Sequence, residues 1–267
     1  MSADGQPLII FVPGLLPKPE REVHREALLR CLLAGVQRID PDVAAAIEAQ
    51  PAAFDIVSWT YDFYRTRQDF EEDRAAVEAV IEKSEADERD IAEATSWKRR
   101  LTRRIYKLGD RVRFLIAHLA NERMELHLRD LTRYLSDVNG IASHTRRMLK
   151  APLLAAAAGN NPVLLIAHSM GSVIAYDSLW ELSRSSYADM RLDLLVTMGS
   201  PLGQSYMQNR LKGADETGAG RYPTNIRHWR NLSAVGDLTA LDPTLADDFG
   251  EMLELGLVES LEDELLL

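Results

Sequence analysis

The sequence has a single cysteine and no long apolar run, and each shortage excludes a class of protein. Cys31 is alone among 267 residues, so no disulfide can form within the chain, and a reducing compartment is indicated. Its setting, "ALLRCLLAG", predicts the apolar face of a helix. No stretch approaches eighteen uninterrupted apolar residues, and the first residues lack the pattern of a secretory signal. We therefore expect a soluble, cytoplasmic protein.

Basic residues are also in the minority, with 31 Lys and Arg against 41 Asp and Glu and a formal net charge of -10. General affinity for nucleic acid would need a local basic patch, because bulk charge opposes it. The chain has no phosphate-binding loop, no dinucleotide-binding glycine fingerprint, no H-E-x-x-H and no paired cysteines. We expect no cofactor, no metal and no nucleic-acid partner.

Short apolar runs of strand character alternate with segments of helical spacing. The runs are "LIIFV" from residue 8, "FDIVSW" from 54, "VLLIAHS" from 163, "LDLLVTMGS" from 192 and "IRHWRNLSAVGD" from 226. This alternation predicts an α/β fold, in which a mostly parallel sheet has helices on both faces. We expect a single domain over residues 1–267, with its active site beyond the carboxyl ends of the strands.

A long stretch between the second and third strands shows no strand signal and predicts a helical insertion, or cap, at about residues 66–140. Residues 71–93 are strongly acidic, whereas residues 98–113 are strongly basic. We expect these two segments to neutralise each other across a helical hairpin. Membrane contact through the insertion remains the alternative.

The segment "LLIAHSMGSVIAY", residues 164–176, places a serine where a strand ends and a helix begins. A serine on such a sharp turn projects above the sheet, provided that the residues two before and two after are small, and here these are Ala167 and Gly171. We predict that Ser169 is a nucleophile. The N–H groups of Met170 and of Leu15, in "FVPGLL", would hold the oxyanion. The alternative is that Ser169 only caps the helix.

The succession of "PGLL", "AHSMG", "GSPLG" and "NLSAVGDLTALDP" resembles the α/β-hydrolase family in its lipase and esterase branch. The likeness covers about residues 8–64 and 141–243. It implies a serine hydrolase that cleaves an ester, or a thioester or amide, through an acyl-enzyme on Ser169. The substrate class it implies is a small acyl ester or a lipid-like molecule.

The same resemblance implies a triad in the chain order serine, acid, histidine, and Asp237 stands at the position of the acid. No histidine follows Asp237. We expect His168 to be a packed core residue and His228 to be structural. His24, which follows the loop that carries Leu15, is the non-standard candidate for the base.

Three explanations for the missing histidine stay open. The chain can be a shortened hydrolase that lacks the last strand and the histidine, it can use an unusual histidine, or it can be a binding or scaffold protein built on a hydrolase fold. We favour the first, because "SLEDELLL" shows no closing strand.

Overall fold

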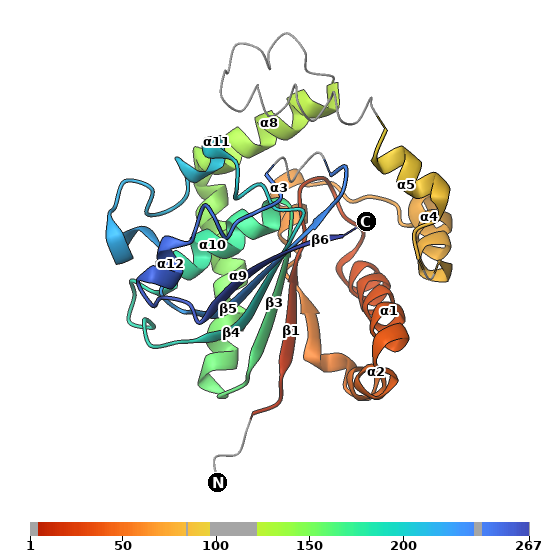
Figure 1. The fold of residues 1–267 in the computed structure, drawn as a ribbon, viewed down its shortest axis with the longest axis horizontal. Coiled ribbons are helices and arrows are strands. Elements are labelled where there is room, and N and C mark those ends of the chain that lie inside the picture. Colours follow the sequence, from red (N-terminus) through yellow and green to blue (C-terminus); the bar gives the residue numbers. More distant parts are fainter. Residues whose placement is uncertain (1–4, 84, 97–121, 238–241, 267) are drawn as a thin grey trace.

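A six-stranded parallel sheet runs through the molecule in the strand order β2-β1-β3-β4-β5-β6 (Figure 1). The computed structural model describes residues 5–83, 85–96, 122–237 and 242–266. The strands are β1 (Leu8–Val12), β2 (Phe54–Ile56), β3 (Val163–His168), β4 (Leu192–Met198), β5 (Ile226–Ala234) and β6 (Ser260–Leu266). The five strands that the sequence predicts are all present.

The described helices fill the connections between these strands. The α-helices are α1 (Arg21–Ile39), α2 (Pro41–Glu48), α3 (Trp59–Tyr64), α4 (Glu71–Glu82), α5 (Glu88–Ala94), α8 (Glu122–Leu135), α9 (Ile141–Ala158), α10 (Met170–Leu182), α11 (Ser205–Gln208) and α12 (Glu251–Glu254). The 3-10 helices are η1 (Pro51–Ala53), η2 (Val138–Gly140) and η3 (Gly218–Arg221).

The direction of strand addition reverses at the centre of the sheet. From β1 the chain moves outward to β2, then crosses back to β3 and continues to β4, β5 and β6. Because parallel crossovers are right-handed, this reversal places α1 and α2 on one face and α9 and α10 on the other, as Figure 1 shows. The predicted fold class is confirmed. The carboxyl ends of β1 and β3 flank the reversal, which is where open α/β sheets bind ligands.

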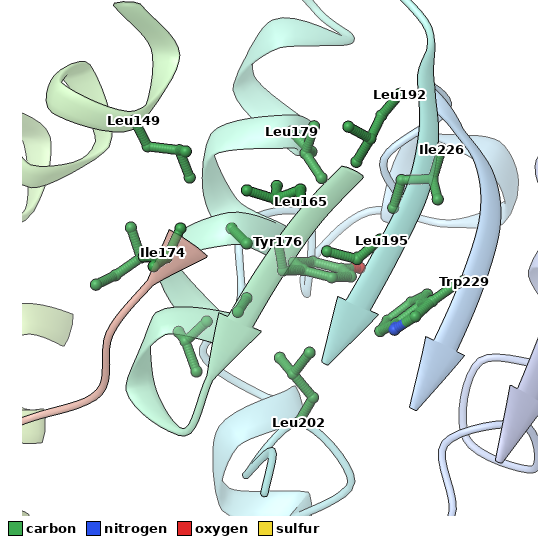
Figure 2. Packing of buried hydrophobic residues seen from close by; sticks show 14 of the residues in the cluster. Leu149, Leu165, Ile174, Tyr176, Leu179, Leu192, Leu195, Leu202, Ile226 and Trp229 are labelled. Atoms are coloured by element: carbon green, nitrogen blue, oxygen red, sulfur yellow. The ribbon is translucent and has the colours of Figure 1, made fainter. Parts of the chain in front are cut away.

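The helix α10 is the most extensively buried helix in the described part of the chain, and it contacts α9, β3 and β1. Val173, Ile174 and Leu179 on α10 are fully buried. They belong to one apolar cluster with Leu165 of β3 and Leu195 of β4, part of which Figure 2 shows. A helix with apolar residues on every side is stable only where other elements surround it. This packing fixes the unit formed by β3 and α10, and with it the turn between them.

The prediction that the closing strand is absent is wrong, because "SLEDELL" forms β6 along the edge of the sheet. Its register on β5 is held by cross-strand charge pairs. The Arg230 guanidinium lies 2.8 Å from the Glu262 carboxylate, and Arg227 lies 2.9 Å from Glu259. Opposite charges that face each other on neighbouring strands in this way favour the pairing of β6 with β5.

The structure also tests the predictions for Cys31 and for the helical insertion. Cys31 lies on a helix, α1, as predicted, but it is exposed and α1 has no buried residue, so the prediction that it lies on the apolar face is wrong. Between β2 and β3 the described residues form helices and no strand, as expected. The basic segment, residues 98–113, lies outside the described residues.

A buried polar network joins α8, α9 and α10. The Tyr134 hydroxyl of α8 donates to Oδ2 of Asp177 on α10 at 3.1 Å. Arg146 of α9 pairs with Glu181 of α10 at 2.8 Å, and Lys150 pairs with the same carboxylate at 2.6 Å. Buried charges are tolerated only when they are paired in this way, so α8 is held in a defined position on the main domain.

Asp177 makes the stability of this network depend on pH. Burial raises the pKa of Asp177 from 3.8 to about 6, against the lowering effects of the Lys212 N–H and of Arg146. Between these two values the native chain holds more protons than the unfolded chain, so its stability falls as the pH rises through 6. We expect Asp177→Asn to gain about 2 kcal/mol of unfolding free energy relative to the native chain between pH 4 and pH 7.

Urea unfolding at several pH values measures this difference. The control is Asp189→Asn, which makes the same change at an exposed aspartate in a turn. A difference for Asp177→Asn that is the same at every pH would contradict the prediction.

Candidate active site

Ser169 occupies a strained turn between β3 and α10. Its backbone angles are φ 52° and ψ -122°, a combination that residues other than glycine rarely adopt. The turn is held on both sides, because the Ser169 N–H donates to the Met198 carbonyl oxygen at 2.8 Å and the Ser172 hydroxyl donates to the Ser169 carbonyl oxygen at 2.5 Å. The Ser169 side chain makes no capping bond to α10, so the helix-cap alternative is wrong.

The turn also requires small residues around it. A Cβ atom on Gly171 would lie 2.2 Å from the Val12 carbonyl oxygen, and one on Gly14 would lie 2.9 Å from the Ser169 Cβ. Ala167 is fully buried. The end of β1 therefore lies directly against the first turn of α10, and no side chain larger than hydrogen fits at Gly171 without displacing backbone.

Two backbone N–H groups are the candidate oxyanion donors, one at the start of α10 and one in the loop after β1. Met170 is the first residue of α10, whose initial N–H groups have no partner within the helix, and Leu15 follows Gly14. Within the described part of the chain, the N–H groups of Leu15 and Met170 make no hydrogen bond. The structure thus leaves both predicted oxyanion donors unused.

The loop after β1 is held by α3, a contact that the sequence analysis did not predict. The Trp59 indole donates to the Pro13 carbonyl oxygen at 2.8 Å, and the Leu16 N–H donates to the Tyr64 hydroxyl oxygen at 3.1 Å. Leu16 has a φ of 76°, which is rare for a bulky residue. One short helix thus fixes both ends of the segment that contains Gly14 and Leu15.

Asp237 lies beyond the carboxyl end of β5, at the same edge of the sheet as Ser169. It follows Gly236, whose φ is 86°, and its N–H donates to the Ala234 carbonyl oxygen at 3.1 Å. β5 is two places from β3, which corresponds to about 10 Å between the strands. A Cβ on Gly236 would lie 2.6 Å from the Ala94 carbonyl oxygen, so the end of α5 contacts this turn.

The segment after Asp237 is anchored by two polar residues that sequence reasoning missed. Asp263 of β6 accepts hydrogen bonds from the N–H groups of Leu245 and Ala246, each at 2.9 Å. The Asn231 side chain of β5 donates to the Pro243 carbonyl oxygen at 2.9 Å and to Asp263 at 2.8 Å. The partners of each bond are ten or more residues apart in sequence, so no local pattern reveals them.

His168 is exposed at the end of β3, so the prediction of a packed core residue is wrong. Its Nδ1 lies 3.2 Å from the position that a Cβ on Gly14 would take. Desolvation by the residues around its ring lowers the pKa of His168, as does the positive charge of Lys18, whereas the Asp237 carboxylate raises it. His168 therefore lies within the electrostatic reach of Asp237.

The other histidines are less closely associated with Ser169. Burial, followed by the charge of Lys18, lowers the pKa of His24 to about 4, so its imidazole is neutral at neutral pH. His228 contacts the Ser260 hydroxyl of β6 at 3.0 Å, in keeping with a structural role. Among the described residues, no histidine is hydrogen-bonded to the Ser169 side chain.

Comparison with known proteins gives no assignment. No protein-family model matches the chain, and no curated protein and no solved structure matches it either. Of the helices that the structure describes, none has the length and apolar character to cross a membrane.

Strain at Ser169 has a measurable consequence for stability. Replacing a non-glycine residue in this conformation by glycine relieves about 1–3 kcal/mol of strain, and added freedom in the unfolded chain offsets about 0.4–1 kcal/mol of that. We expect Ser169→Gly to be about 1 kcal/mol more stable than Ser169→Ala by urea unfolding. At the helical position Ser178 the order should be reversed, with alanine favoured. The same order at both positions would contradict the prediction.

Proposed function

We propose that the protein is a serine hydrolase that cleaves an ester, or a thioester or amide, through an acyl-enzyme on Ser169. The observation that carries the proposal is the strained conformation of Ser169 at the strand-to-helix turn, at the reversal point of a parallel sheet. Strain of this kind persists where the surrounding structure enforces it, and it concentrates at functional sites. The resemblance of "AHSMG" to the nucleophile turn of lipases and esterases supports the same function.

The proposed reaction has two steps, acylation of Ser169 and hydrolysis of the acyl-enzyme. The Ser169 hydroxyl loses its proton to a base and attacks the acyl carbonyl carbon, while the N–H groups of Leu15 and Met170 stabilise the negative oxygen. The leaving alcohol, thiol or amine departs with the proton that the base returns. Water, activated by the same base, then attacks the acyl carbonyl carbon, which releases the carboxylic acid product and restores the Ser169 hydroxyl.

We propose His168 as the base, oriented by Asp237, with His24 as the second candidate. His168 and Asp237 lie at the same edge of the sheet, and the Asp237 carboxylate raises the pKa of His168 against the larger lowering effects of burial and Lys18. A carboxylate that favours the charged imidazole is what the acid of a triad provides. Burial and the charge of Lys18 lower the pKa of both histidines, but Asp237 opposes this lowering at His168. The pKa of His24 falls to about 4, which makes His24 a poor proton acceptor at neutral pH.

The proposed substrate is a small acyl ester or a lipid-like ester in the cytoplasm. Leu16 is 43% exposed and Met198 is 36% exposed, and both lie at the carboxyl ends of strands next to Ser169. Apolar side chains in this position favour an acyl chain over a charged or sugar-like group.

A non-catalytic scaffold or binding protein on the same fold is the second candidate. The observation in its favour is that, in the described part of the chain, Ser169 has no hydrogen bond to a histidine. A hydroxyl without a base is a weak nucleophile.

Labelling with a fluorophosphonate distinguishes the two candidates. We expect the native chain to take up one equivalent of the probe and Ser169→Ala to take up none, as measured by intact-protein mass spectrometry. The control is Ser185→Ala, which removes an exposed hydroxyl and should label like the native chain. Equal labelling of native chain and Ser169→Ala, or no labelling of either, would favour the scaffold.

The same assay ranks the two histidines. We expect His168→Gln to slow labelling by about 100-fold or more, because general base catalysis contributes about 10²–10⁴-fold. His24→Gln should change the rate by less than about threefold. A larger effect of His24→Gln would transfer the role of base to His24.

A further inference from the structure

The helical insertion is connected to the loop that carries the candidate oxyanion donor Leu15. Asp130 of α8 is 3% exposed and accepts a hydrogen bond from the Tyr64 hydroxyl at 2.9 Å. The same hydroxyl accepts the N–H of Leu16 at 3.1 Å. A single oxygen atom thus bridges α8 and the residue that follows Leu15.

The position of Tyr64 is itself fixed by several contacts. Arg133 of α8 donates to the Phe63 carbonyl oxygen at 2.7 Å, and its guanidinium lies 4.3 Å from the centre of the Phe63 ring. At the other end of α3, the Trp59 indole holds the Pro13 carbonyl oxygen. Both α8 and the loop are therefore attached to α3, and the Tyr64 hydroxyl completes the connection between them.

Leu16 needs such a support because its backbone is strained. A leucine with a φ of 76° is stable only where fixed contacts enforce it, and its N–H is held by the Tyr64 hydroxyl. The peptide plane that joins Leu15 to Leu16 turns with the φ of Leu16. Loss of the hydroxyl would allow this plane to relax and would reorient the adjacent backbone of Leu15.

We propose that Tyr64 is a positioning residue for the oxyanion loop, and that Asp130 of α8 holds the Tyr64 hydroxyl in place, so that docking of the insertion sets the reactivity of Ser169. This inference rests on the proposed serine hydrolase function. Tyr64 acts through the backbone of Leu15 and Leu16 and is not itself a group that contacts the substrate. Burial raises the pKa of Tyr64, so its hydroxyl keeps the proton that it donates to Asp130.

The test is the saturation kinetics of fluorophosphonate labelling, which separate probe binding from the covalent step. We expect Tyr64→Phe to lower the maximal labelling rate by about 10- to 100-fold, because a displacement of about 1 Å near the reacting atoms costs up to about 100-fold. The probe concentration at half-maximal rate and the final labelled fraction should stay the same. The matched control is Tyr61→Phe on the same helix, an exposed tyrosine whose change should leave the rate unaltered.

Variants of Asp130 test the link to α8 in the same labelling experiment. We expect Asp130→Asn, which keeps an oxygen acceptor for Tyr64, to label within about threefold of the native rate, and Asp130→Ala to fall to within about threefold of the Tyr64→Phe rate. Equal rates for Tyr64→Phe and Tyr61→Phe would overturn the positioning role, as would a fall in the labelled fraction at an unchanged maximal rate. A native rate for Asp130→Ala would overturn the link to α8. If the native chain is not labelled at all, the proposed hydrolase function fails first, and the positioning role fails with it.

Discussion

The contact between the end of β1 and the start of α10 is the constraint on which the rest of the site depends. Gly171 leaves no room between the first turn of α10 and the Val12 carbonyl oxygen, and Gly14 lies against Ser169. Because the two backbones meet at van der Waals distance, the chain must turn sharply between β3 and α10. The left-handed conformation of Ser169 follows from that turn, and the loop after β1 is brought beside it. Neither strand nor helix could shift without losing the packing that buries α10.

The insertion contributes to this arrangement from outside the sheet. α8 contacts α3 through Asp130 and Arg133, and it contacts α10 through the bond between Tyr134 and Asp177. α3 in turn holds the loop after β1, while α10 begins at Ser169. The same helix is thus attached to both segments that present candidate oxyanion donors. Its attachment to α10 includes a carboxylate whose burial opposes ionisation, so that attachment carries an energetic cost at neutral pH.

The central strands and the turn at Ser169 could be predicted from the sequence because their signals are local. An apolar run, a serine between small residues and a helix follow one another within residues 163–182. β6 was missed because three acidic residues in succession, 262–264, interrupt any apolar alternation, and its pairs with the arginines of β5 span more than thirty residues of sequence. Tyr64 was missed for the same reason, since its partners Leu16 and Asp130 are 48 and 66 residues away. Contacts between distant segments leave no periodicity to detect.

Ser169 and Leu16, the two residues with strained backbones, are supported by different parts of the molecule. Ser169 is held by the sheet and by α10, through the Met198 carbonyl oxygen and the Ser172 hydroxyl, all within the best-packed region. Leu16 is held by Tyr64, whose support comes from α8. Local unfolding requires the least free energy where few buried contacts are broken, and that condition describes the exposed Leu16 better than Ser169. The turn at Ser169 should therefore keep its conformation if the contacts of α8 are lost, while the loop beside it should not. In the proposed hydrolase, the part of the site that α8 influences is therefore the backbone of Leu15, rather than Ser169 or Met170.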